Sequence, residues 1–312
     1  MSINNIGNKY CYNNQSSFNK AVSPFSAPFN QVFDKFTLQM QNLSGVQNVQ
    51  DSFEKDDKVK IIAHRGYSEA APENTIPAFI AAAENGYSTI ECDVEWTKDG
   101  VPVILHDETI NRTARRQNGW RMFWPRKCSN LTYDKLLEYD FGSWFSKDFK
   151  GTKIPRFDEL LDCADKYDLN LYVELKETAD FDKNKAQKLY DEAKEAGLED
   201  KITWISFNSD YLKMMADISP NSRLGYLTKK DVDDNTIDTL KELKTGTNEV
   251  FLDVKSTKIS DASSKMLKDA GFDFEAWTVD DAEKIEDLAA YDCKGITTNK
   301  ITQDDIADYY NP

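Results

Sequence analysis

The chain has 312 residues, of which 40% are hydrophobic and 30% are charged, and its formal net charge is −15 at pH 7. This length suits one large α/β barrel, because such barrels run to roughly 250 residues as a single domain. The acidic charge argues against nucleic-acid binding, which needs a basic surface for the phosphates. No apolar run approaches the ~20 residues of a membrane-spanning helix, so we expect no transmembrane segment.

Residues 1–57 are rich in Asn, Gln and Ser, and only FNQVFDKFTLQMQNL hints at an amphipathic helix there. The composition predicts a flexible or loosely docked N-terminal extension rather than a dedicated binding segment, and it identifies no partner. The first residues lack the basic and apolar regions of a Sec signal peptide. We therefore expect a cytoplasmic location, and export by another route stays open.

From residue 59 onward, short β-branched runs alternate with helical stretches, the pattern of parallel βα units. Eight strands are predicted, at 59–64, 88–96, 170–176, 202–207, 223–228, 249–254, 274–279 and 294–299. Helices are predicted between them, at 75–86, 156–168, 183–197, 209–218, 235–246, 259–271 and 281–291. This order predicts a (β/α)8 TIM-type barrel over residues 58–312, with its site at the carboxyl ends of the strands. An open doubly wound sheet is the alternative, but no GxGxxG or P-loop follows any strand.

The alternation of strands and helices is interrupted from about residue 107 to 155. The segment NRTARRQNGWRMFWPRKC in this insertion carries five arginines and two tryptophans in an otherwise acidic chain. We interpret the insertion either as a cover over the mouth of the barrel or as a solvated surface loop. The position of the insertion in the fold, rather than its composition, distinguishes these two interpretations.

Two histidines are present, and each closes an apolar strand-like run, His64 after VKIIA and His106 after VPVIL. A side chain at the carboxyl end of a barrel strand points toward the region of catalysis. One such histidine alone is more often structural. Two in equivalent positions favour an acid/base pair, because imidazole exchanges its proton near pH 7.

Acidic residues recur at a spacing of two in the predicted strands. Glu91 and Asp93 therefore share one face of strand 88–96, and Glu174 and Lys176 repeat this spacing in strand 170–176. Carboxylates ~4 Å apart repel by about 4 kcal/mol at an effective dielectric of ~20, so an inward cluster needs a cation. We predict a divalent metal ion, Mg²⁺ or Ca²⁺, held by Glu91, Asp93 and Glu174. The alternative is that these acids pair with basic residues on the barrel surface.

The pair Asp99-Gly100 predicts a two-residue hairpin loop after strand 88–96. In that register Asp93 faces His106, with the two Cβ atoms ~5 Å apart, so a histidine stands beside the metal ion. The inference depends on the register, because a bulge shifts the pairing by one residue.

The segment AHRGYSEAAPENTIPAFIAAAENGYSTIECDVEWTKDGVPVILHDETINRT closely resembles the signature of the glycerophosphodiester phosphodiesterases, within the phospholipase-C-like phosphodiesterase superfamily. The resemblance continues through GSWFSKDFKGTKIPRFDELL, LYVELK, AWTVD and GITTN, and covers roughly residues 59–300. Two features depart from the family pattern. Asp280 stands where Asn is common, and no proline follows the last strand.

The resemblance implies hydrolysis of a glycerophosphodiester to sn-glycerol 3-phosphate and an alcohol. It implies that His64 and His106 form the acid/base pair. It also implies that the metal ion is bound by Glu91, Asp93 and Glu174. It further implies that Arg65 and Lys176 contact the phosphate and that Trp277 lies against the alcohol part of the substrate. Glu73 and Asn74 of the PENT motif are expected beside these groups, in a supporting or structural role.

Three other functions are weighed against this one. A lysophospholipase D-type enzyme acting on lipid diesters would need an apolar entry surface, for which MFWP is the one candidate segment. A non-catalytic binding barrel predicts damage to the acid/base pair or the metal set, and every such position is occupied. A hydrolase that does not act on phosphate would leave Arg65 and Lys176 unexplained.

Overall fold

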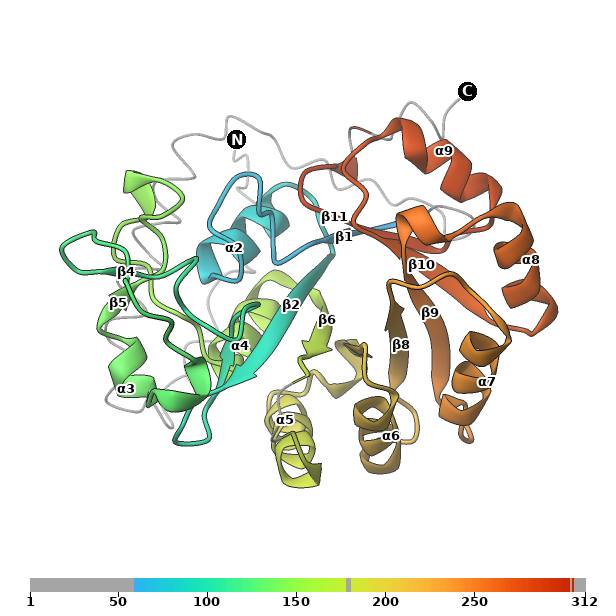
Figure 1. Ribbon diagram of the computed structural model, residues 1–312, viewed down its shortest axis with the longest axis horizontal. Coiled ribbons are helices and arrows are strands. Elements are labelled where there is room, and N and C mark those ends of the chain that lie inside the picture. Colours follow the sequence, from blue (N-terminus) through green and yellow to red (C-terminus); the bar gives the residue numbers. More distant parts are fainter. Residues whose placement is uncertain (1–58, 178–180, 304, 306–312) are drawn as a thin grey trace, which may run out of the picture. The chain divides into compact units, whose positions relative to one another are not determined.

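The computed structural model describes residues 59–177, 181–303 and 305, so the predicted extension 1–57 lies outside the described residues. Within them, eight parallel strands form a barrel that closes because the first strand, β1, pairs with both β11 and β2. The strands are β1 (Lys60–Ala63), β2 (Thr89–Trp96), β6 (Asn170–Leu175), β7 (Ile202–Ser206), β8 (Arg223–Thr228), β9 (Glu249–Lys255), β10 (Asp273–Trp277) and β11 (Gly295–Thr298). The predicted TIM-type barrel is confirmed (Figure 1).

Helices link consecutive strands and surround the barrel (Figure 1). They are α2 (Ile76–Glu84), α4 (Phe157–Tyr167), α5 (Lys183–Glu195), α6 (Ser209–Ile218), α7 (Asp234–Leu243), α8 (Asp261–Asp269) and α9 (Glu283–Ala290). Local sequence explains their ends. Asp182 and Asp233 accept backbone N–H groups at the starts of α5 and α7, and Gly197 and Gly271 adopt φ of 70° and 79° just after α5 and α8. None of the described helices is long and apolar enough to cross a membrane.

The interior of the barrel is filled from its amino end toward the site. A buried apolar group occupies the centre, formed by Ile62, Tyr172, Ile205, Leu227 and Phe251. Nearer the amino ends of the strands, the buried carboxylate of Glu275 accepts hydrogen bonds from Tyr172 (3.0 Å) and Arg223 (2.9 Å). In barrels of this type the site lies at the opposite, carboxyl ends of the strands.

A ninth strand, β3 (Pro102–Ile104), runs antiparallel to the end of β2, with Val94 opposite Ile104. The predicted hairpin register is wrong by one residue. Asp93 lies opposite Leu105, whose N–H donates to the Asp93 carbonyl oxygen at 2.9 Å, and therefore does not face His106.

The turn itself explains the shifted register. Thr97 and Val101 close it, because the Thr97 N–H donates to the Val101 carbonyl (3.0 Å) and the Thr97 hydroxyl accepts the Val101 N–H (2.9 Å). The loop therefore contains three residues, 98–100, and Gly100 supplies the positive φ of 75° that such a loop needs.

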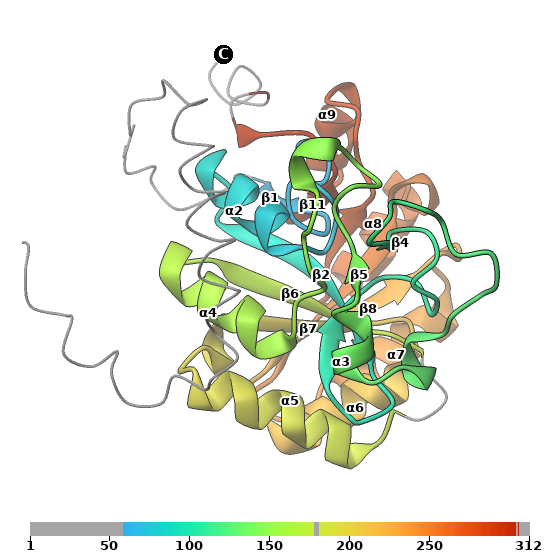
Figure 2. The same cartoon turned by 90° about the vertical axis from the view of Figure 1, so that its left-hand side faces the viewer.

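The insertion builds a small core of its own against β3. Its elements are β4 (Arg115–Arg116), η1 (Cys128–Asn130), α3 (Tyr133–Leu136), β5 (Tyr139–Asp140) and η2 (Lys147–Phe149). Two other 3-10 segments, η3 (Glu199–Lys201) and η4 (Ser256–Lys258), lie outside the insertion. Ile110, Leu136 and Phe141 pack with Val103 and Leu105. Figures 1 and 2 show β4, β5 and α3 gathered on the side of the barrel next to β2.

Candidate active site

An open cavity of about 630 Å³ lies at the carboxyl ends of the barrel strands. Residues from the strands β2 and β6 to β11, and from the segments that follow β1 and several other strands, line it. The cavity is lined by seven of the residues predicted for the site: His64, Arg65, Glu91, His106, Glu174, Lys176 and Trp277. Of the insertion, Asp107 and Glu108 line the cavity, and the described aromatic stretch that follows does not. The fold thus collects in one place residues that are more than two hundred positions apart.

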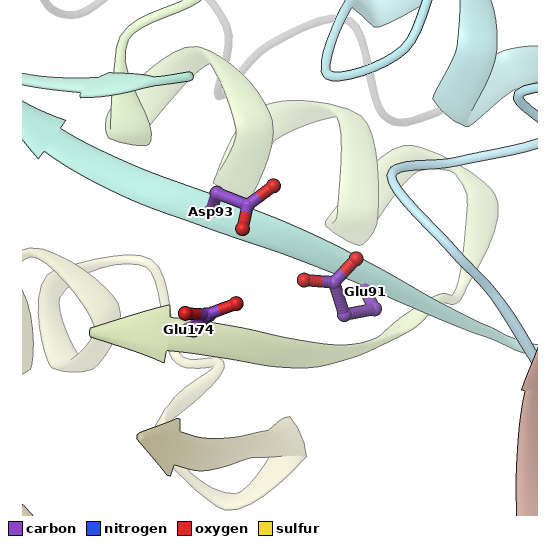
Figure 3. A group of neighbouring side chains, drawn as sticks. All are labelled: Glu91, Asp93 and Glu174. Atoms are coloured by element: carbon purple, nitrogen blue, oxygen red, sulfur yellow. The ribbon is translucent and has the colours of Figure 1, made fainter. Parts of the chain in front are cut away.

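Three carboxylates face one another beside this cavity (Figure 3). Glu91 and Asp93 come from one face of β2, and Glu174 comes from β6, where it is the Cα partner of Asp93. One oxygen of each lies within 4.8 Å of the others, and Glu91 and Asp93 are buried. The predicted cluster is therefore present. Three hard oxygen donors on rigid strands suit a divalent ion such as Mg²⁺ or Ca²⁺.

The charge on this cluster is partly balanced by the protein itself. Lys176 Nζ lies 2.9 Å from Asp93 Oδ1 and 3.0 Å from Glu174 Oε1. Burial raises the pKa of Glu91 well above its usual range and that of Glu174 to about 7. Burial opposes ionisation of Asp93 too, but Lys176 and Arg65 together lower its pKa. A bound cation would favour the ionised form of all three carboxyls.

Arg65 is held in a sharp turn between β1 and α2. It has a φ of 60°, and the next residue, Gly66, has a φ of 77°. A Cβ atom on Gly66 would lie 2.7 Å from the carbonyl carbon of Ala78, so the turn requires glycine. The backbone N–H of Arg65 donates to Glu91 (2.9 Å), and its guanidinium Nε lies 3.5 Å from Asp93. The sequence His64-Arg65-Gly66 thus places the Arg65 guanidinium at the edge of the carboxylate cluster.

The tautomer of His64 is set by residues from the other end of the chain. Its Nδ1 lies 2.7 Å from Oδ1 of Asn299, whose amide nitrogen donates to Asp280 at 2.6 Å. A carboxylate only accepts, so the amide group of Asn299 faces Asp280 and its carbonyl oxygen faces His64. Nδ1 of His64 therefore carries the proton, and Nε2 lies toward Glu91, 3.9 Å from its Oε2. Burial, and then Arg65, lower the pKa of His64 to about 4.

His106 is held in the same way by a different partner. Its Nδ1 donates to Asp107 at 2.6 Å, and Asp107 also accepts Nε–H of Arg112 at 2.7 Å. Arg112 in turn donates to both oxygens of Glu73, at 2.5 and 2.8 Å. Glu73 also accepts from Arg65 at 2.7 Å, so one network joins the candidate phosphate-binding arginine to the second histidine.

Asn74 completes the PENT motif beside the cluster. Its amide nitrogen donates to Asp93 Oδ2 at 2.6 Å, and its oxygen accepts the backbone N–H of Asp93 at 3.3 Å. Its φ of 55° lies in the left-handed region, which Asn tolerates better than most residues. Both residues of the motif predicted to support the site therefore touch it.

The far wall of the cavity is aromatic. Trp277 lies edge to face with Phe207 at a ring-centroid distance of 5.6 Å, and its indole N–H donates to the backbone oxygen of Asp253 at 3.0 Å. Lys229 Nζ lies 4.5 Å from the Phe207 ring centre and 5.7 Å from that of Trp277. This wall offers an apolar face opposite the charged cluster.

Sequence reasoning missed several residues of the site. Glu95 is the third acid on the inward face of β2, where burial raises its pKa to about 7, and the spacing of two already pointed to it. Asp253 is 2% exposed, and among the described residues its Oδ1 has no hydrogen-bond partner. An acid inside the apolar run EVFLDV was its one signal. Arg112 and Asn299 lie in segments that carry the family resemblance, but the sequence assigned neither a role in the site, because their partners are distant along the chain.

Comparisons with known proteins identify the family. The model of the glycerophosphoryl diester phosphodiesterase family matches residues 64–303. A glycerophosphodiester phosphodiesterase of Caldanaerobacter subterraneus subsp. tengcongensis is 34% identical over 170 residues, which are 54% of this chain and 67% of that protein. A glycerophosphodiester phosphodiesterase of Bacillus subtilis is 28% identical over 258 residues, 78% of this chain and 84% of that one.

Solved structures share the fold. A phosphodiesterase of Oleispira antarctica, in complex with the product sn-glycerol-3-phosphate, matches with a TM-score of 0.71 at 22% identity, over 81% of this chain and 97% of that one. The chain therefore belongs to the glycerophosphoryl diester phosphodiesterase family and is a phosphoric diester hydrolase.

Proposed function

We propose that this enzyme hydrolyses glycerophosphodiesters to sn-glycerol 3-phosphate and an alcohol, with a divalent metal ion and a histidine pair. The observation that carries the proposal is the meeting, in one cavity, of a buried carboxylate cluster with two histidines that are each held at Nδ1. Family membership supports the substrate class, and the product named for the Oleispira antarctica structure is the one expected here.

Substrate binding would involve both sides of the cavity. Glu91, Asp93 and Glu174 would hold the metal ion, which supplies positive charge at the phosphate oxygens when bound. Arg65 and Lys176 would bind the phosphate and stabilise the charge that grows on it in the transition state. Trp277 would lie against the alcohol part of the substrate, on the aromatic wall.

Proton transfer would fall to the two histidines. Nε2 of one removes a proton from the nucleophile, and Nε2 of the other protonates the leaving alkoxide. Asn299 and Asp107 accept the Nδ1–H groups, keep each ring in one tautomer and stabilise the imidazolium that forms. The arrangement suits either water or the glycerol 2-hydroxyl as nucleophile, the second through a cyclic phosphodiester.

The test is release of glycerol 3-phosphate from glycerophosphocholine by the full chain with Mg²⁺, Ca²⁺ or EDTA. We expect turnover that EDTA abolishes and metal restores, and that Glu174→Gln lowers by at least about 100-fold. Glu195→Gln, on the surface at the end of α5, is the matched control. Calorimetry should show metal binding to the wild type and much weaker binding to Glu174→Gln. Turnover that ignores EDTA would contradict the proposal.

One observation favours a second candidate, a lysophospholipase D-type reaction on lipid diesters. The insertion exposes the large aromatic side chains of Trp120, Phe123 and Trp124. Release of choline from lysophosphatidylcholine, compared with release from glycerophosphocholine, separates the two. A ratio of kcat/KM that favours the lipid would support the second candidate.

A further inference from the structure

The insertion carries a cluster of exposed aromatic side chains. Trp120, Phe123 and Trp124 are 73%, 84% and 74% exposed, and among the described residues only Met266, at 37%, joins them as an exposed large hydrophobic residue. The rings of Phe123 and Trp124 lie edge to face, 5.1 Å apart. Grouped exposed aromatics of this size are characteristic of an interaction surface.

The charge around this cluster has one sign. Residues 109–133 contain six basic residues and no acidic one, in a chain whose net charge is −15. Three of the six are engaged, because Arg112 binds Glu73 and Asp107, Arg115 donates to backbone oxygens, and Lys127 binds Glu108. The other three, Arg116, Arg121 and Arg126, pair with no acid in the part of the chain that the structure describes.

The segment has a defined backbone conformation. The N–H of Arg116 donates to the Trp120 carbonyl at 3.0 Å, and the side chain of Asn111 donates to the Trp124 carbonyl at 2.9 Å. Met122, only 7% exposed, packs into the core of the insertion. The loop thus buries its methionine and presents its aromatic residues outward.

This surface adjoins the rim of the active-site cavity. Glu108 lines the cavity, and its carbonyl oxygen accepts the N–H of Cys128 at 2.9 Å. Ile110, two residues further on, donates its N–H to the carbonyl of Arg126 at 2.9 Å. The chain that ends the aromatic stretch therefore runs beside the chain that leaves the cavity.

We propose that residues 116–126, the aromatic loop, dock on a bilayer that contains anionic phospholipids. Tryptophan rings partition to the level of the lipid head groups, and guanidinium groups bind lipid phosphates. The free arginines attract an anionic surface, while the acidic remainder of the chain is repelled by it. Both effects favour one orientation, with the rim of the cavity beside the membrane. The proposal concerns binding and does not depend on the catalytic roles proposed above.

The test measures binding of the full chain to vesicles of phosphatidylcholine, with or without phosphatidylglycerol. We expect co-sedimentation with the anionic vesicles only, weakening as salt is raised. Tryptophan emission should shift to the blue, because the exposed Trp120 and Trp124 would leave water on binding. Trp96 and Trp204 are already buried, at 4% and 1% exposed, and should not contribute to the shift.

Two sets of variants separate charge from aromatic contact. The triple variant Arg116→Gln, Arg121→Gln, Arg126→Gln should weaken binding by at least about tenfold. Trp120→Ala, Phe123→Ala, Trp124→Ala should weaken it by about tenfold or more and remove the blue shift. The matched controls are Lys183→Gln, Lys265→Gln, Lys284→Gln, which removes three exposed charges elsewhere, and Met266→Ala. Thermal unfolding monitored by circular dichroism confirms that each variant is folded.

Three outcomes would overturn the proposal. The first is no binding of the wild type to anionic vesicles. The second is an aromatic variant that binds as well as the wild type, or a lysine control that loses as much binding as the arginine variant. The third is a wild-type dimer that the aromatic variant converts to a monomer, without vesicle binding, since this would assign the surface to a second copy of the chain.

Discussion

The amide oxygen of Asn299 lies 2.7 Å from Nδ1 of His64, and the amide nitrogen of Asn299 donates to Asp280 at 2.6 Å. His64 directly follows the first strand of the barrel, and Asn299 directly follows the last. The pairing of β1 with β11 places Ala63 beside Thr298 and brings the two side chains together. Closure of the barrel therefore sets the tautomer of a candidate catalytic histidine.

Asp280→Ala should lower kcat by about 10–100-fold, because Asn299 loses the acceptor that orients it. Asp280→Asn should recover part of the activity, since its one amide oxygen can accept the Asn299 side-chain N–H, whereas its NH₂ group replaces the oxygen that accepts the Asn299 backbone N–H. Steady-state kinetics with glycerophosphocholine measure both. KM should change little, and the pH profile of kcat should move in the alanine variant alone. A matching loss of activity and of thermal stability, with an unchanged pH profile, would indicate a merely structural role.

Leaving-group chemistry should distinguish the two histidines. His64→Ala and His106→Ala should each lower the hydrolysis of glycerophosphocholine by about 100-fold or more. A p-nitrophenyl diester needs no protonation of its leaving group, so the variant that lacks the general acid should recover most of its rate. The variant that lacks the general base should not. Recovery in both variants, or in neither, would contradict a division of roles between them.

Arg112 should contribute to activity, although its hydrogen bonds go to Glu73 and Asp107 rather than to a predicted metal ligand. Arg112→Gln removes the link between Glu73 and Asp107, so both Arg65 and His106 lose part of their support. We expect kcat/KM to fall by about 10–100-fold. Arg112→Lys should recover little of this, because an ammonium cannot make the paired contacts of a guanidinium. Arg116→Gln, an exposed arginine in the same insertion, should leave kcat/KM for glycerophosphocholine unchanged.

Asp140 should make stability depend on pH. Its carboxylate accepts N–H groups from Gly142, Ser143 and Gly151 at 2.9–3.0 Å. Burial opposes its ionisation, but these donors prevail and hold the pKa below its usual value. A lowered folded-state pKa adds stability that is complete above the unfolded-state pKa, ~3.9, and is lost as pH falls through the folded-state pKa.

Asp140→Asn tests this directly. Urea unfolding should show the wild type more stable by about 1–2 kcal/mol at pH 7, and the difference should shrink as the pH falls below ~4. Asp134→Asn, an exposed site in the same insertion, should show little difference at either pH. A gap for Asp140→Asn that stays constant with pH would show that the carboxylate charge does not contribute.

The sequence by itself determined the order of the barrel and the faces of its strands. Strand residues alternate between two faces, so the spacing of Glu91 and Asp93 was enough to place both carboxylates together. Glycine after several helices also marked where they end, as at Gly197 and Gly271. These features are local, since each depends on residues only a few positions apart.

The tertiary structure decided the contacts between distant segments and the register of the hairpin. Hydrogen bonds between Thr97 and Val101 close a loop one residue longer than predicted, and His106 is therefore out of line with Asp93. No pattern in the sequence indicated that Asn299 would meet His64, or that Arg112 would join Glu73 to Asp107. Such pairs form because the barrel closes and the insertion folds back, and the geometry of these long-range contacts is not encoded in local periodicity.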